Sequence, residues 1–205
     1  MSVQLEVGED YADIRDQVAR ICEGFPGAYW QELDEKAEYP HAFVDALTES
    51  GYLGALIPEA YGGAGLPLRA ASVILETIHA QGCSAAACHA QMYTMGTVLR
   101  YGSDEQKSKY LPKIATGELR LQAFGVTEPT TGSDTTQLKT RAEKDGDEYV
   151  VNGQKVWTSR ALQSDLMLLL ARTTPVDQVA KRTDCLLYTS PSPRDATLSR
   201  MPSSA

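Results

Sequence analysis

The spacing of apolar residues changes once along this chain, near residues 118–120, and this change restricts the possible folds more than any other feature. Over residues 9–117, apolar side chains recur at the three- and four-residue spacing of amphipathic helices. Beyond that point the spacing becomes two, as in Leu121 and Ala123, which is typical of strands. A run of helices followed by a run of strands predicts an α+β chain with two domains.

Start and stop signals predict the ends of several helices. Pro40 suits the first turn of a helix that ends near Gly51. Further helices are expected over 68–80 and over 84–100, the latter capped by Ser84. The spacing of Ser103 and Gln106 is that of a capping box for one more helix, which Pro112 kinks or ends before Gly117 closes it.

Turn residues divide the second half into short strands. Asp145-Gly146 predicts a hairpin between strands at 139–143 and 148–151. Asn152-Gly153 predicts a second turn, followed by a strand over 155–158. The apolar run at 165–171 predicts a buried strand. We therefore expect a helical bundle at 1–119 and the beginning of a β-domain at 120–184.

Charge and composition exclude some functions. The formal net charge is -8, so a nucleic-acid partner, which requires a basic face, is not expected. No apolar run reaches the ~20 residues of a membrane span. No signal or transit peptide is visible, which predicts a cytoplasmic protein, or one of the mitochondrial matrix if the source is a eukaryote. The group His79, Cys83, Cys88 and His89 is interpreted as helix packing, and no metal site is expected.

Residues 185–205 abandon the strand pattern and are polar and rich in turn residues. They are expected to be a disordered or non-native tail. The string can be back-translated, in one frame, into the transposon-end and index-adapter DNA used in short-read library preparation. We therefore expect the biological chain to continue differently after Asp184, and we exclude the tail from fold reasoning.

One loop carries the chemistry. In Phe124–Asp134, Thr127 and Glu128 follow a strand and Gly132-Ser133-Asp134 predicts a polar turn, which offers hydroxyl and N–H groups to an anionic or polar ligand. About 24 residues later comes Trp157, beside two hydroxyls, which suits a large planar heterocycle. The structural alternative is a Ser-rich turn and a tryptophan that anchors the core.

Four motifs, in order, resemble the acyl-CoA dehydrogenase family. They are LIPEAYGGAG at 56–65, YGSDEQK at 101–107, GVTEPTTGSD at 125–134 and NGQKVWTS at 152–159. The resemblance covers residues 9–184. Thr130, Thr131 and Gln137 stand where the family has smaller residues, which leaves the path of the loop open.

The resemblance implies an α+β multidomain fold: a helical domain, a β-barrel-like middle domain and a C-terminal four-helix domain, with FAD between the last two. Val126 and Thr127 would meet the flavin ring, Trp157 would pack against it, and Thr158 would hydrogen-bond near its reactive nitrogen. Ser133 would lie near the pyrophosphate or the acyl-CoA thioester. The cofactor-binding residues implied are Phe124, Gly125, Val126, Thr127, Gly132, Ser133, Trp157, Thr158 and Ser159, with Ser133 also binding substrate.

The implied reaction is α,β-dehydrogenation of an acyl-CoA thioester in fatty acid metabolism. Its catalytic base is a glutamate of the C-terminal domain, which this chain does not reach, so no catalytic residue is assigned and the fragment alone is expected to be inactive. Electron-transferring flavoprotein is the expected acceptor, and the complete protein is expected to be a homo-oligomer. Two alternatives stay open: an acyl-CoA oxidase of the same fold, and a truncated non-catalytic module that binds a CoA ester or a partner.

Overall fold

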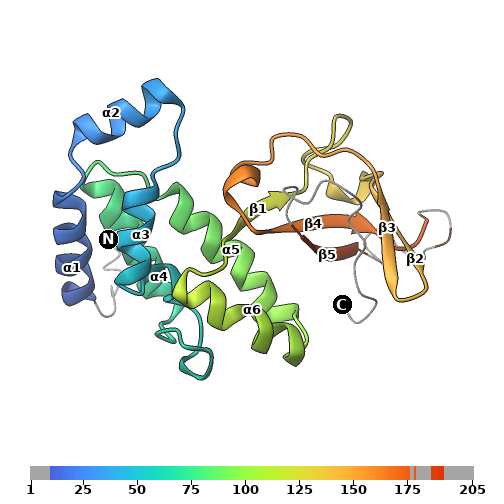
Figure 1. The fold of residues 1–205 in the computed structure, drawn as a ribbon, viewed down its shortest axis with the longest axis horizontal. Coiled ribbons are helices and arrows are strands. Elements are labelled where there is room, and N and C mark those ends of the chain that lie inside the picture. The colour runs from blue at the N-terminus through green and yellow to red at the C-terminus, as the bar shows by residue number, and fades with distance from the viewer. Residues whose placement is uncertain (1–9, 176–177, 179–185, 192–205) are drawn as a thin grey trace, which may run out of the picture.

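The computed structural model describes residues 10–175, residue 178 and the backbone of residues 186–191. Its helices come first in the chain and its strands second, as the apolar spacing predicts, and Figure 1 shows the two parts side by side. The helical part comprises α1 (Ala12–Glu23), α2 (Gly27–Lys36), α3 (His41–Glu49), α4 (Leu68–Ala80), α5 (Ala86–Tyr101) and α6 (Asp104–Thr116). None of the helices that the structure describes has the length and hydrophobicity to cross a membrane.

The helix signals in the sequence are confirmed in part. Ser103 and Gln106 form both bonds of a capping box at the start of α6. Pro112 lies inside α6 without ending it. The predicted cap of α5 is wrong by one residue: Ala85 is the N-cap, and the Ser84 hydroxyl accepts only a long bond, 3.4 Å, from the Ala86 N–H. Helix α2 was not predicted from the sequence, and it has no fully buried residue.

The strands form one sheet around β4 (Leu166–Arg172). Strand β1 (Leu121–Gly125) pairs with β4 in parallel, and the expected hairpin is present as β2 (Arg141–Asp145) and β3 (Glu148–Asn152). Strand β2 joins the sheet by a parallel contact with β4. On its other side β4 pairs antiparallel with β5 (Leu186–Pro191), which lies within the predicted tail; residues 192–205 are outside the described part.

The predicted strand at 155–158 is wrong. These residues have no strand assignment, and Trp157 has φ 60°, a left-handed conformation that extended backbone excludes. The Val156 N–H instead donates to the Thr127 carbonyl over 2.9 Å, so this segment runs beside the loop that follows β1.

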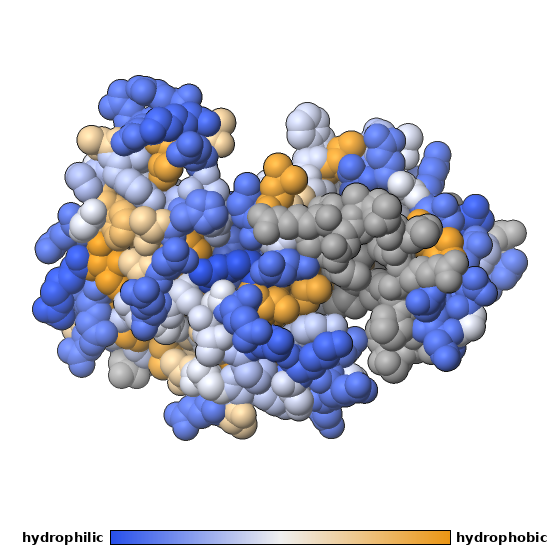
Figure 2. Space-filling view, viewed as in Figure 1, coloured by the Kyte–Doolittle hydropathy of each residue, from blue (hydrophilic) through white to orange (hydrophobic). Residues whose placement is uncertain are grey.

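The buried core connects the two parts through α5 and β1. One cluster lies among the helices, and a second joins Met95 of α5 and Ile114 of α6 to Leu121 of β1. Figure 2 shows hydrophobic side chains exposed at the middle of one face, where the helices meet the sheet. Strand β1 is therefore held directly against α5.

Candidate functional site

The predicted site loop begins where β1 ends. Glu128 and Thr131 exchange backbone hydrogen bonds of 2.8 and 3.1 Å, which close a tight turn over Pro129 and Thr130. The tight turn thus lies three to four residues earlier than Gly132-Ser133-Asp134. Asp134 instead caps a short 3-10 helix, accepting from the Thr136 N–H over 3.1 Å.

A buried ion pair holds this loop in place. The Glu128 carboxylate accepts from the backbone N–H groups of Lys139 (2.6 Å) and Thr140 (2.8 Å) and from the Lys155 ammonium (2.9 Å). Both charged side chains are at most 8% exposed. Burial acts to raise the pKa of Glu128, but the hydrogen bonds from Thr140, Lys139 and Lys155 outweigh it and lower the pKa to about 2.

Lys155 also positions residues 155–159, which we call the tryptophan segment. Its ammonium donates to the Val126 carbonyl over 2.9 Å, and the next residue, Val156, donates its N–H to the Thr127 carbonyl. Trp157 follows directly. Its side chain is 88% exposed, so the alternative that it anchors the core is wrong. A bulky residue in a left-handed conformation with its ring in solvent is an unusual combination, and such outliers concentrate at ligand-binding sites.

An aromatic contact joins the end of β1 to α5. The half-buried Phe124 ring lies 5.8 Å from the Tyr93 ring, centroid to centroid, and Tyr93 lies 5.2 Å from the His89 ring. Tyr93 is 39% exposed. The site therefore has walls from the end of β1 and from the middle of α5.

The remaining predicted residues take up different positions. Gly125 is buried, and a Cβ there would lie 3.2 Å from the Leu169 and Met167 side chains. A Cβ on Gly132 would lie 4.0 Å from Thr127 Cγ2, which places this glycine against the predicted site. Ser133 and Ser159 are exposed, whereas Thr158 is half-buried.

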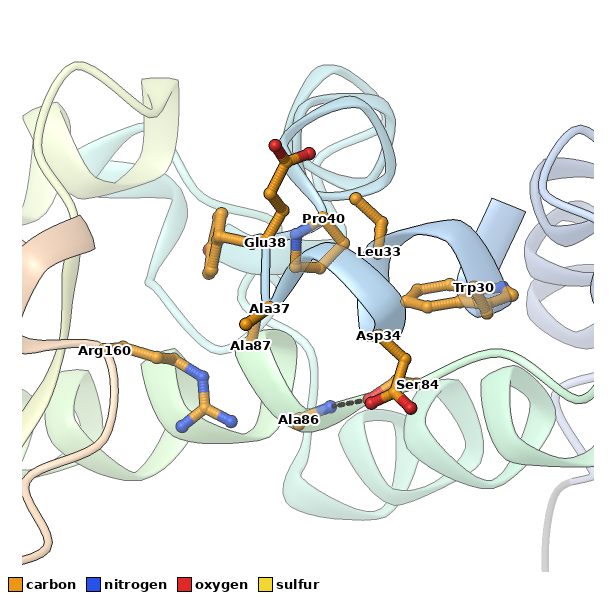
Figure 3. Close-up of a pocket in the computed structure, with 11 residues that line it drawn as sticks. Trp30, Leu33, Asp34, Ala37, Glu38, Pro40, Ser84, Ala86, Ala87 and Arg160 are labelled. Atoms are coloured by element: carbon orange, nitrogen blue, oxygen red, sulfur yellow. Dashed lines mark hydrogen bonds between the residues drawn. The ribbon is translucent and has the colours of Figure 1, made fainter. Parts of the chain in front are cut away.

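A cleft of about 280 Å³ lies beside the tryptophan segment. Its walls come from α2, the link from α2 to α3, the start of α5 and Arg160, which follows Ser159. Figure 3 shows the Arg160 guanidinium directed toward Ala86 at the start of α5, whereas the Glu38 carboxylate points the other way.

Sequence reasoning missed three residues of this region: Tyr93, Lys155 and Arg160. Lys155 belongs to one of the four family motifs, but the local sequence gives no role to a charge two residues before Trp157. Its contacts with Glu128 and the Val126 carbonyl explain it. Tyr93 had no distinguishing signal, because a tyrosine at helical spacing is ordinary in a packed helix.

Comparison with known proteins places the chain in a family. Residues 8–118 match the family model for the acyl-CoA dehydrogenase N-terminal domain, and residues 123–203 match the model for the middle domain. A (2S)-methylsuccinyl-CoA dehydrogenase of Cereibacter sphaeroides is 40% identical over 176 residues, which cover 80% of this chain and 30% of that protein. A glutaryl-CoA dehydrogenase of Desulfococcus multivorans is 39% identical over 148 residues, covering 69% of this chain and 38% of that protein.

A solved structure gives the same result. The acyl-CoA dehydrogenase from Geobacillus kaustophilus superposes with a TM-score of 0.78 at 28% identity, over 89% of this chain and 48% of that one. The chain thus spans between 30% and 48% of the length of these three proteins. Two domain models of one family match in order, and a relative is 40% identical across most of the chain, so the chain belongs to the acyl-CoA dehydrogenase family.

Proposed function

We propose that this protein takes part in the α,β-dehydrogenation of an acyl-CoA thioester, and that the described residues form one side of the site for FAD and substrate. One observation carries the proposal: Trp157 is 88% exposed at φ 60° and is held beside Thr127 through the adjacent Val156. Two relatives are named for methylsuccinyl-CoA and glutaryl-CoA. From these two names we carry over, for the proposed function, the CoA thioester.

The residues present fit a flavin. A planar heterocycle needs an aromatic face and hydrogen-bonding groups at its edge. Trp157 offers the face, and Thr127 and Thr158 offer hydroxyls. Gly132 has no side chain to occupy the space next to Thr127. When bound, FAD supplies the acceptor for the β-hydride of the substrate, whereas this chain's residues orient the ring and, at Ser133, bind the pyrophosphate or the thioester.

Glu128 does not serve as the base in this proposal. A general base works best with a pKa near the operating pH, whereas the pKa of Glu128 is about 2 and its carboxylate already accepts three hydrogen bonds. The base that removes the α-proton must therefore come from another residue. We assign it to a glutamate of a C-terminal helical domain beyond the residues described here.

The remaining expectations stay predictions. They are that electron-transferring flavoprotein accepts the electrons, that the complete protein is a homo-oligomer, and that it works in the cytoplasm. Residues 185–205 as a non-native tail are also a prediction.

The test uses the complete protein reconstituted with FAD. Trp157→Ala and Thr127→Val should each weaken FAD retention, or slow flavin reduction by an acyl-CoA, about fivefold or more, because each removes a stacking or hydrogen-bonding group. Tyr101→Ala is the matched control, since Tyr101 is 71% exposed on the far end of α5. Unchanged flavin content and reduction rate in both site variants would refute the proposal.

Two further measurements address the alternatives. Fast reoxidation of the reduced flavin by oxygen would indicate an oxidase of the same fold. A colourless protein that takes up no FAD would indicate a non-catalytic module.

A further inference from the structure

Arg160 carries a positive charge that has no carboxylate partner among the described residues, although Tyr39 lies within its electrostatic reach. None of the ion pairs or side-chain hydrogen bonds in this part of the chain involves its guanidinium, although the residue is half-buried. The other arginines near the domain junction differ. Arg120, for example, is paired with Asp45 over 2.9 Å. A half-buried guanidinium gains from a carboxylate, which it can bind with two parallel hydrogen bonds.

The Arg160 side chain lines the cleft described above. Trp30, Leu33 and Pro40 supply apolar wall, and the guanidinium enters from the opposite side (Figure 3). The cleft also contains two carboxylates. Glu38 is directed away from Arg160, and Asp34 extends toward Ser84 (Figure 3). The space in front of Arg160 is therefore lined by the small residues Ala86 and Ala87.

The cleft lies close to the proposed reaction site. Arg160 is three residues from Trp157, and three residues span at most about 10 Å. An acyl group whose thioester end lies at Thr127 and Trp157 has several carbons beyond the reacting pair. An acyl group of four to six carbons, together with the length of the Arg160 side chain, covers a distance of this order.

We propose that Arg160 binds a carboxylate at the far end of the acyl group, so that the preferred substrates are CoA thioesters of short dicarboxylic acids. This inference rests on the proposed function. Arg160 acts as a specificity-determining residue: it takes no part in proton or hydride transfer, but it favours a charged chain end over an apolar one. Asp34 opposes it, because a carboxylate on the facing wall repels the same chain end.

The experiment compares two thioesters in the complete, FAD-loaded protein. Glutaryl-CoA ends in a carboxylate, and hexanoyl-CoA has a chain of similar length that ends in a methyl group. The measured quantity is the ratio of kcat/KM for glutaryl-CoA to that for hexanoyl-CoA. The unmodified protein should favour glutaryl-CoA, and Arg160→Gln should lower the ratio about tenfold or more. Arg160→Lys should fall between the two, because it keeps the charge without the planar fork.

Two further variants make the result specific. Asp34→Asn should raise the ratio, because it removes the opposing charge. Arg69→Gln should leave the ratio as in the unmodified protein, because Arg69 is exposed at the start of α4. If Arg160→Gln does not fold, the lysine and Asp34 variants still decide the question.

The outcomes separate the two proposals. If neither thioester reduces the flavin, the proposed function fails and the inference fails with it. If hexanoyl-CoA is used as well as glutaryl-CoA and the Arg160 variants leave the ratio unchanged, the inference is wrong and the function stands. Equal losses of stability in Arg160→Gln and Asp34→Asn, with no change in the ratio, would show an internal ion pair instead.

Discussion

At the scale of single residues, the site depends on a charge that is fully compensated. Glu128 and Lys155 are both buried, and burying either charge alone would be costly. Together they join three segments, the loop after β1, residues 139–140 and the tryptophan segment. Their function is therefore to hold Thr127 and Trp157 together rather than to exchange protons.

Glu128→Gln should lower the free energy of unfolding by about 3 kcal/mol at neutral pH, because it leaves the Lys155 ammonium without its counter-charge. The folded pKa of Glu128, about 2, lies below its usual 4.5. Its stabilising effect is therefore fully present above about pH 4.5 and is lost as the pH falls toward about 2. Urea denaturation of both proteins should show their difference shrinking over this range.

The exposed pair of Lys36 and Glu32 supplies the control. Glu32→Gln should have little effect at either pH, because water screens exposed charges. A Glu128→Gln difference that stays constant between pH 7 and pH 3 would contradict the assignment of a compensated, ionised carboxylate.

At the scale of elements, close backbone approach decides which glycines are required. Gly63 lies in the turn after η2 (Glu59–Tyr61), and a Cβ there would lie 2.1 Å from the Ile57 carbonyl oxygen. Gly96 lies inside α5, and a Cβ there would meet nothing within 4 Å. The same substitution should therefore act in opposite directions at the two positions.

Gly63→Ala should destabilise the protein by about 1–3 kcal/mol or more, because rigid backbone must move to admit the methyl group. Gly96→Ala should stabilise it by about 0.5–1 kcal/mol, because alanine favours the helix and restricts the unfolded chain. Thermal unfolding of the two variants checks both signs. A loss of stability at Gly96 would show that this part of α5 is packed more tightly than the structure indicates.

Between elements, a chain of buried polar groups joins the α2–α3 link to β1 and α5. The Tyr39 hydroxyl donates to Gln122 over 2.6 Å, and the Gln122 amide donates to Gln91 over 3.2 Å. Both glutamines are fully buried. Burial raises the pKa of Tyr39, so its hydroxyl stays protonated and can donate to Gln122.

Tyr39→Phe should lower the free energy of unfolding by about 1–3 kcal/mol, because the buried Gln122 oxygen loses its donor. Tyr52→Phe removes a similar bond, in which the Tyr52 hydroxyl donates to Gln17 over 2.9 Å. Gln17 is exposed and can bond to water instead, so this variant should lose much less. Chemical denaturation compares the two. Equal losses would show that burial of the acceptor does not matter here.

At the scale of the whole molecule, the two parts share a core. Met95, Ile114 and Leu121 belong to one cluster, and the buried Thr94 hydroxyl bonds to the Leu121 carbonyl. In contrast, four of the five residues of β2 are exposed, so the hairpin contributes little to this core. We infer that α5 and β1 open together, whereas the hairpin opens separately.

Hydrogen exchange tests this inference. Amides of α5 and β1 should exchange with similar, high opening free energies, whereas those of β2 and β3 should exchange with values lower by about 2 kcal/mol or more. Exchange followed by mass spectrometry resolves these segments. If β1 exchanged as fast as the hairpin, the helical and sheet parts would be independent and the site would lack a rigid wall.

The order of helices and strands, the capping box of α6, the β2–β3 hairpin and the family resemblance could all be predicted from the sequence. These features depend on residues close together in the chain, where periodicity, caps and turns act over a few positions. The position of Trp157 could not, because its φ and exposure result from the bonds of Lys155 and Val156 to a loop about 30 residues earlier. The contact of Phe124 with Tyr93, and the charge of Arg160 in the cleft, likewise exist only once α5 packs against β1. Local interactions thus determined the elements, whereas long-range contacts decided which side chains the candidate site presents.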